Sequence, residues 1–498
     1  MVEHGAPELG IYGYNGALFS STKTPILTPL DMGDEGAVLI LRNDSLLKAI
    51  RFLTTVERDK VLQRISYADL SVEEIGSVYE SLLDYTPRIA AAPEKVDDQE
   101  IAAGEFFLDP RGKERKTTGS YYTHPSLVNE LIKSDLLPVL EDRLKAALAG
   151  YDSEHPEKLS PEDRQKAEEA LLAIKVIDPA AGSGAFLIAA DNALGLRLAQ
   201  IRSGDLYPSE REIRRARRDV LAHCLYAVDL NPMAVELCKL SLWINAVVED
   251  EKLNFLDHHI KCGNSLVGAF RRLVTQGIPS EAYGGATGDD KELARALKKR
   301  NDQERAGQVS AFRVTELKNL ADLHAWSELT RLAQEDPAEA ERRYRELQAQ
   351  SEESAERLAF DLWTAAFFWP LEAESDGRTA RERASAGIEA RRGERRQPLP
   401  PTTQDVFQAL ATPRLVDERM KDFTRKLRDQ HRFFHWELEF PEIFGPGGQG
   451  GFDVVLGNPP WERQQFEEKA FFEYRRPEIA NEPSQKTRWS MVLELQKT

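Results

Sequence analysis

The chain has 498 residues, enough for about three domains and a sizeable hydrophobic core. Its 66 Lys and Arg residues stand against 83 Asp and Glu residues, a net charge of −17, so any contact with nucleic acid must be local. Three cysteines without a C-x-x-C pair exclude a disulfide framework and a four-thiolate zinc site, and they fit a reducing compartment. No apolar run approaches the ~20 residues of a membrane span, and the first residues lack a secretory signal, so we expect a cytoplasmic protein.

Residues 1–116 are predicted to form a mainly helical region. The segments LLKAIRFLT (46–54) and VEEIGSVYESLLDY (72–85) place apolar residues at helical spacing. Residues 95–116 are charged and are interrupted by Pro110 and Gly112, which indicates a connection and a boundary near residue 116.

Residues 117–270 are predicted to hold the first part of an α/β core. After a helix at about 126–149, a β-rich run at 174–177 leads through a Gly-rich turn into an apolar helix. A second unit follows, with a strand at 224–228, an acid at Asp229 and a helix from about residue 232. The alternation of strands and helices predicts a parallel, doubly wound sheet.

Residues 271–432 are predicted to be a long helical insertion, with charged helices near 310–369. Within it, one stretch has a local net charge of +4 and is either a solvated loop or a contact for a phosphate backbone. That stretch sets seven arginines against three glutamates: Arg378, Arg381, Arg383, Arg391, Arg392, Arg395 and Arg396 against Glu382, Glu389 and Glu394.

Residues 433–498 are predicted to contain a late strand at 452–456 and the turn that follows it. Just before this strand, FFHWELEFPEIF (433–444) indicates hydrophobic packing rather than a stacking platform for nucleic acid. The residues His124, His258 and His259 form no metal constellation with the cysteines, so we predict no metal site.

The Gly-rich turn is the first candidate for a ligand site. Its strand ends in Asp178, and the turn brings backbone N–H groups and a helix N-terminus to the carboxyl edge of the sheet. A dinucleotide-binding fingerprint is disfavoured, because its third glycine is replaced by Leu187 and because Asp229 lies well beyond the ~20 residues expected between the glycines and the acid. The sequence also has no P-loop motif, which disfavours a nucleotide hydrolase. Since an acid at Asp229 can accept hydrogen bonds from ribose hydroxyls, the pattern indicates a nucleoside without a pyrophosphate. The alternative is a turn that only joins a strand to a helix.

The tetrapeptide Asn458-Pro459-Pro460-Trp461 is the second candidate. Consecutive prolines fix φ and remove two amide donors, so the turn displays carbonyl groups and a rigid asparagine. The Asn458 side-chain oxygen and the Pro459 carbonyl can accept both hydrogens of a planar NH2 group and turn its lone pair toward an electrophile. Trp461 can stack on the ring that carries this amine. The alternative is an ordinary loop between a strand and a helix.

Together, DPAAGSGAF (178–186) and NPPW (458–461) resemble the motifs of S-adenosylmethionine-dependent amino-methyltransferases of the DNA adenine-N6 branch. Further segments resemble the large Eco57I-like restriction-modification enzymes and related phage-defence methylases. These segments are YNGALF (14–19), ISYADLSVEEIGSVYESLL (65–83), TTGSYYTHPSLV (117–128) and KCGNSLVG (261–268).

The resemblance implies a role for each matching residue. Asn458, Pro459, Pro460 and Trp461 would hold a target adenine flipped out of double-stranded DNA. Asp229 would hold the cofactor ribose, and Asn264, or less favourably Asp257, would recognise its adenine. The methionine side would be bound by Thr123 and by residues of the glycine turn, namely Asp178, Pro179, Ala180, Gly182, Ser183, Gly184 and Phe186. At the position where members of that family usually have Thr-Pro, this chain has Thr123-His124-Pro125.

The resemblance implies a Rossmann-like methyltransferase sheet of about seven strands, yet only 37 residues follow Trp461. We therefore expect a sheet that is incomplete at the C-terminus. The chain resembles the middle of a longer protein, or a second polypeptide supplies the remaining strands and the target-recognition domain. The leading hypothesis is a DNA adenine-N6 methyltransferase of a restriction-modification or phage-defence system. The alternatives are a non-catalytic subunit that needs a partner and a methyltransferase for protein glutamine or ribosomal RNA.

Overall fold

The computed structural model describes residues 43–58, 60–65, 85–96, 99–109, 123–248, 254–284, 290–311, 323–371, 398–445, 450–459, 479, 482 and 484–495. They form two compact units. The first unit draws on Met1–Cys262, Ser327–Arg345 and Phe452–Pro459, and the second on Gly263–Trp326, Glu346–Gly451 and Pro460–Thr498. The segment that we expected to be one helical insertion is thus divided between the units.

The N-terminal region differs from our expectation. It contains one described helix, α1 (Asn43–Thr54), where helical spacing predicted it. The prediction of a mainly helical region is wrong for the other described residues, which form three antiparallel pairs: β1 (Thr55–Arg58) with β2 (Val61–Arg64), β3 (Thr86–Ile89) with β6 (Phe106–Asp109), and β4 (Glu94–Val96) with β5 (Gln99–Ile101). Strands of three or four residues leave little periodic signal, although FFLD in β6 does alternate exposed and buried residues. The expected helix at 72–85 and the boundary near residue 116 lie outside the described residues.

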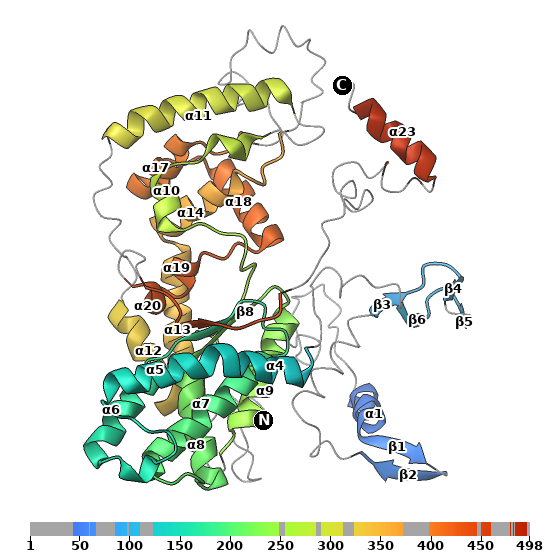
Figure 1. Cartoon of the computed structure of the whole chain (residues 1–498). Coiled ribbons are helices and arrows are strands. Elements are labelled where there is room, and N and C mark those ends of the chain that lie inside the picture. The colour runs from blue at the N-terminus through green and yellow to red at the C-terminus, as the bar shows by residue number, and fades with distance from the viewer. Residues whose placement is uncertain are drawn as a thin grey trace. The chain divides into compact units, whose positions relative to one another are not determined.

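A parallel sheet forms the centre of the first unit (Figure 1). Its described strands are β7 (Val176–Asp178), β8 (Leu225–Asp229), β9 (Ile260–Cys262) and β10 (Val454–Val455), in the order β10-β7-β8-β9. Every residue of β7 and β8 is buried, as expected for parallel strands covered on both faces. The three strands predicted at 174–177, 224–228 and 452–456 are confirmed, with ends shifted by one or two residues.

Helices with clear start signals complete this core. Pro125 opens α4, Ser160 caps α6, Ser209 forms a capping box for α8, and Asn231 caps α9. The elements are α4 (Pro125–Leu131), η4 (Ile132–Leu136), α5 (Leu137–Ala147), η5 (Pro156–Lys158), α6 (Pro161–Leu172), α7 (Ala185–Ser203), α8 (Glu210–His223) and α9 (Pro232–Ala246). Their apolar faces form one hydrophobic core with the sheet. Of the later helices, α12 (Leu323–Glu335) and α13 (Pro337–Glu352) contribute Ser327–Arg345 to this unit.

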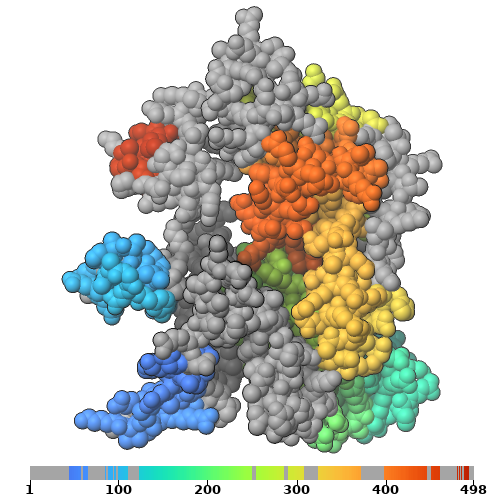
Figure 2. All heavy atoms as spheres, turned by 180° about the vertical axis from the view of Figure 1, so that it is seen from behind, coloured from blue at the N-terminus to red at the C-terminus, as the bar shows by residue number. Residues whose placement is uncertain are grey.

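The second unit is helical and has its own core, built around α14 (Ala355–Ala365). Helix α14 packs against α10 (Arg271–Thr275), α17 (Thr403–Ala411) and α18 (Glu418–His431). In α18 the buried residues are Met420, Thr424 and Leu427, while most of its charged residues are exposed. Figure 2 shows this part of the chain in orange. The remaining elements are η6 (Ser280–Tyr283), α11 (Lys291–Ala311), η7 (Pro413–Leu415), α19 (Trp436–Glu439), α20 (Pro441–Phe444) and α23 (Gln485–Leu495).

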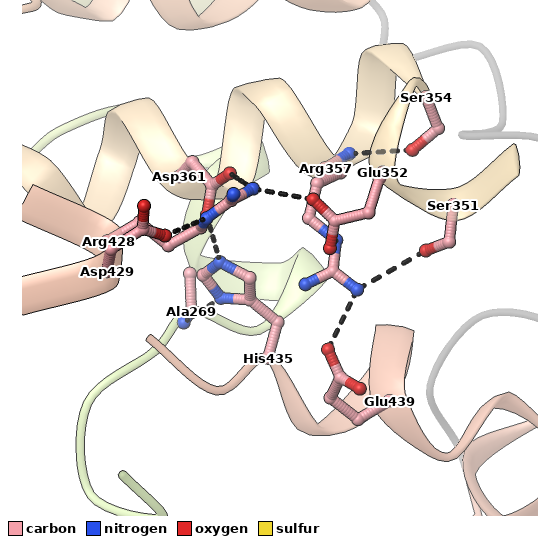
Figure 3. A network of polar contacts seen from close by, with 10 residues as sticks. All are labelled: Ala269, Ser351, Glu352, Ser354, Arg357, Asp361, Arg428, Asp429, His435 and Glu439. Carbon is pink, nitrogen blue, oxygen red and sulfur yellow. Dashed lines mark hydrogen bonds and ion pairs between the residues drawn. The ribbon is translucent and has the colours of Figure 1, made fainter. Parts of the chain in front are cut away.

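A buried polar network joins the elements of the second unit (Figure 3). His435 is fully buried, and its Nε2 lies 3.0 Å from Asp361 Oδ1 while the Ala269 N–H donates to its Nδ1 at 3.0 Å. Because Nδ1 accepts, Nε2 is the nitrogen that carries the proton and donates to Asp361. Beside it, Arg357 pairs with Glu439 at 2.8 Å, and Arg428 pairs with Glu352 at 2.7 Å.

The FFHWELEFPEIF segment (433–444) is buried in this second unit, and together with the preceding Arg432 it binds residues 264–271. Asn264 N–H donates to Arg432 O at 2.8 Å, and Phe434 N–H donates to Val267 O at 2.8 Å. A Cβ at Gly268 would lie 2.0 Å from the Phe434 carbonyl oxygen, so this close approach requires a glycine. The arginine-rich stretch at 378–396 lies outside the described residues.

Candidate cofactor and substrate site

The two candidate turns lie next to each other at one edge of the sheet. Strands β8 and β9 follow β7 in the sheet along one edge of β7, whereas β10 pairs with its opposite edge. The strand order therefore reverses at β7, and open α/β sheets bind ligands at the carboxyl ends of the strands beside such a point. The glycine turn leaves the carboxyl end of β7, and Gly457-Asn458-Pro459 leaves that of β10.

The glycine turn is shaped by backbone conformation. Gly182 has φ +53° and Gly184 has φ +90°, a region that side chains rarely adopt. A Cβ at Gly184 would also lie 2.8 Å from Cys238 Sγ. Gly184 caps α7, so the turn delivers the helix N-terminus to the carboxyl edge of the sheet.

Asp178 is a fully buried carboxyl at the end of β7. Its Oδ1 accepts the Ala180 N–H at 3.0 Å, whereas its Oδ2 has no hydrogen-bond partner among the described residues. Burial raises the pKa of Asp178 to about 7, the bond from Ala180 opposes this, and the charge of Asp229 adds to it. A buried acceptor in this state is matched to a positively charged or hydrogen-bond-donating ligand.

Asp229 ends β8 and holds two backbone segments. Its Oδ2 accepts the Gly182 N–H at 2.8 Å, and its Oδ1 accepts the Asn231 N–H at 2.7 Å. One carboxylate thus ties the glycine turn to the start of α9. Each carboxylate oxygen offers two lone-pair positions, so these bonds are compatible with further acceptance from ribose hydroxyls.

Asn458 is positioned by its backbone and by its side chain. Leu456 N–H donates to Ile177 O at 2.9 Å, and a Cβ at Gly457 would lie 3.0 Å from Asp178 Oδ1. The Asn458 side chain donates from Nδ2 to Thr123 Oγ1 at 3.2 Å. Pro459 is exposed beside it, while Pro460 and Trp461 lie outside the described residues.

The remaining predicted residues fall in several places. Pro179, Ala180 and Ser183 lie in the glycine turn, and Phe186 is buried in the first turn of α7. Asn264 belongs to the second unit, where its Oδ1 accepts the Leu266 N–H at 3.1 Å. The alternative candidate, Asp257, is ion-paired with the buried Lys239, so its carboxylate has a structural partner.

Three residues of this site were not predicted. Asn231 donates to Asp229 and caps α9, and an Asn before a helix-starting Pro could have indicated this cap. Gly457 and Cys238 acquire their roles through contacts between distant segments, which leave no local signal. Among the described residues, no group of three or more His, Cys, Asp or Glu side chains is arranged to hold a metal ion. None of the described helices combines the length and the apolar character needed to cross a membrane.

Comparison with known proteins gives two matches. Residues 223–488, more than half of the chain, match the model of the Eco57I restriction-modification methylase family. The chain is also 28% identical over 283 residues to a Methanocaldococcus jannaschii protein described as "Putative type II restriction enzyme and methyltransferase". That match covers 51% of this chain and 21% of the relative, so it spans about a fifth of the relative's length. The chain therefore belongs to the Eco57I restriction-modification methylase family.

Proposed function

We propose that this chain carries the cofactor-binding and catalytic residues of an S-adenosylmethionine-dependent DNA adenine-N6 methyltransferase with a Rossmann-like sheet. The observation that carries the proposal is the meeting of two turns at the point where the strand order reverses. One turn offers backbone N–H groups and a buried acceptor, and the other offers the oxygens of an Asn-Pro sequence.

The residues of the glycine turn fit S-adenosylmethionine. The Asp178 oxygen without a partner among the described residues suits the ammonium of the methionine part, and Asp229 suits the ribose hydroxyls. Positive φ values at Gly182 and Gly184 let a ligand lie against the backbone. The cofactor supplies a methyl group that is electrophilic because it is carried on a positively charged sulfur.

Asn458 and Pro459 supply the substrate side of the reaction. The Asn458 Oδ1 and the Pro459 carbonyl accept the two hydrogens of the adenine amine, which turns the nitrogen lone pair out of the ring plane. The proton leaves after the nitrogen has become cationic, so no strong base is required. The adenine must leave the duplex to reach this turn, and Trp461 is the proposed stacking partner.

The proposal is tested by incubating the chain with labelled S-adenosylmethionine and DNA, RNA or protein. We expect label in DNA. We also expect Asn458→Ala to abolish transfer while the dissociation constant for S-adenosylmethionine changes less than about twofold. Asn192→Ala, which removes a half-buried amide within α7, is the matched control and should leave transfer unchanged.

Other outcomes separate the alternatives. Label only in RNA or protein would contradict the DNA substrate and favour a methyltransferase for ribosomal RNA or protein glutamine. Cofactor binding without any transfer would favour a subunit that needs a second polypeptide. Loss of cofactor binding in Asn458→Ala would show that Asn458 belongs to the cofactor side of the site.

A further inference from the structure

A hydrogen bond ties the Asn-Pro turn to a segment 335 residues earlier in the chain. Asn458 Nδ2 donates to Thr123 Oγ1 at 3.2 Å, and both side chains are half-buried within the first unit. An asparagine amide has a donor arm and an acceptor arm fixed at opposite ends of one plane. A partner for Nδ2 therefore sets the direction in which Oδ1 points.

Thr123 is itself held in place by the start of α4. It immediately precedes His124, the helix cap, whose Nδ1 accepts the Ser126 N–H at 3.3 Å. Pro125 fixes φ at the first helical position, and Val128 is buried in the core of the first unit. The hydroxyl thus comes from a helix end anchored in the core rather than from an isolated surface loop.

The backbone of Asn458 is positioned by other contacts. The bond between Leu456 and Ile177 continues the pairing of β10 with β7, and Gly457 lies against Asp178. These contacts place the backbone of Asn458. The contact with Thr123 acts on the donor arm of its side-chain amide.

We propose that Thr123 is a positioning residue that orients the Asn458 amide, so that Oδ1 is presented to the amine of the substrate. This inference rests on the proposed function of Asn458. It gives Thr123 a role on the substrate side, which differs from the cofactor role that the family resemblance implies. Positioning of this kind acts on the rate of transfer and not on the affinity for the cofactor.

The first test compares Thr123→Val, which removes the hydroxyl at nearly constant shape, with Thr123→Ser, which keeps it. At saturating DNA and S-adenosylmethionine, we expect Thr123→Val to lower the single-turnover rate about five- to tenfold, the scale of one hydrogen bond. Its dissociation constant for S-adenosylmethionine should stay within about twofold of the wild type, and Thr123→Ser should recover most of the rate.

The control is Thr275→Val, which removes a half-buried threonine hydroxyl in the second unit. It should leave both quantities unchanged. Weaker cofactor binding in Thr123→Val with an unchanged saturated rate would overturn the proposal and place Thr123 on the cofactor side. Wild-type rate and affinity in Thr123→Val would overturn it as well.

A second measurement is independent of activity. In the full chain labelled with 15N-asparagine, the side-chain amide signal of Asn458 is identified by its loss in Asn458→Ala. We expect this signal to shift in Thr123→Val and to stay near its wild-type position in Thr123→Ser and Thr275→Val. An unchanged signal in Thr123→Val overturns the proposal. If the wild-type chain transfers no methyl group to DNA, the proposed function fails separately, and the amide signal still decides the role of Thr123.

Discussion

Asp178 has a carboxyl group whose ionised form lowers the stability of the fold but suits the proposed binding of a cationic ligand. Its carboxyl is buried beside Asp229, and one oxygen has no hydrogen-bond partner among the described residues. Because burial raises the folded-state pKa to about 7, far above the value of about 3.8 for an exposed group, ionisation above pH 7 costs folding free energy. A cationic ligand would compensate for this cost when it binds.

The affinity for S-adenosylmethionine is therefore expected to rise with pH. The ionised form of Asp178 binds the cationic ligand best, so the dissociation constant at pH 6 should be about tenfold higher than at pH 8. Calorimetric titration at the two pH values measures this change. Asp178→Asn should bind weakly at both values.

The same substitution should affect folding in the opposite sense. The stability linked to the raised pKa is fully present below pH 3.8 and is lost as pH rises through 7, so Asp178→Asn should melt at a higher temperature than the wild type at pH 8. The difference should be less than half as large at pH 5 and should vanish below about pH 3.8. A variant that is no more stable at pH 8 and binds the cofactor normally would contradict this account of Asp178.

At the scale of elements, the two units use buried polar groups in different ways. In the first unit, Asp229 ties the glycine turn to α9. In the second unit, the Asp361–His435 pair ties α14 to the segment before α19 and to the backbone of Ala269 (Figure 3). Both ring nitrogens of His435 are engaged and its side chain is fully buried, so we interpret this pair as structural rather than catalytic.

Removal of the His435 ring should therefore destabilise the second unit. His435→Phe leaves the Ala269 N–H without an acceptor and deprives Asp361 of a donor, and we expect a loss of about 2–4 kcal/mol in the free energy of unfolding. Denaturant unfolding followed by tryptophan fluorescence measures this loss. The control is His155→Phe, which removes a surface pair with Glu157 and should change stability by less than about 0.5 kcal/mol. Equal effects of the two substitutions would contradict the structural role of the network.

Local signals were sufficient to predict several elements. A buried β-rich run before glycines predicted β7, its turn and α7, and Pro232 in a first turn predicted the start of α9. The strands of the N-terminal region were missed because each has only three or four residues, too few for a clear alternation of apolar and polar side chains. The parallel pairing of Val455 with Ile177 and the contact between Asn458 and Thr123 join distant segments, so no local pattern could reveal them.

At the scale of the whole molecule, buried ionisable groups make stability depend on pH in opposing directions. Burial lowers the pKa of His258 to about 3, and the positive charges of Lys261 and His223 add to this effect. Burial also raises the pKa of Asp191 to about 8. As pH falls, protonation of His258 favours unfolding, whereas protonation of Asp191 favours folding. A variant of one residue is needed to measure its contribution alone.

His258→Phe isolates the histidine contribution. The stability contributed by the neutral ring is fully present above pH 6.5 and is lost as pH falls toward 3. At pH 5 this loss amounts to about 2 kcal/mol. The free energy of unfolding of both proteins is therefore to be measured at pH 7 and at pH 5. Between these values the wild type should lose about 2 kcal/mol that His258→Phe does not lose. A difference between the two proteins that does not vary with pH would show that His258 does not titrate as proposed.

The net charge of −17 is compatible with a DNA substrate if the contact is confined to the edge of the sheet where β7 and β10 end. The chain spans about a fifth of the length of its Methanocaldococcus jannaschii relative. The proposed chemistry lies at the Asn-Pro turn.

The most direct test of the proposed reaction is the identity of the methylated nucleoside. Duplex DNA is incubated with the chain and S-adenosylmethionine carrying a trideuterated methyl group, digested to nucleosides and measured by mass spectrometry. We predict trideuterated N6-methyldeoxyadenosine with the wild-type chain and none with Asn458→Ala. Label on deoxycytidine instead of deoxyadenosine, or an equal yield from Asn458→Ala, would contradict the proposed reaction and the role of Asn458 in it.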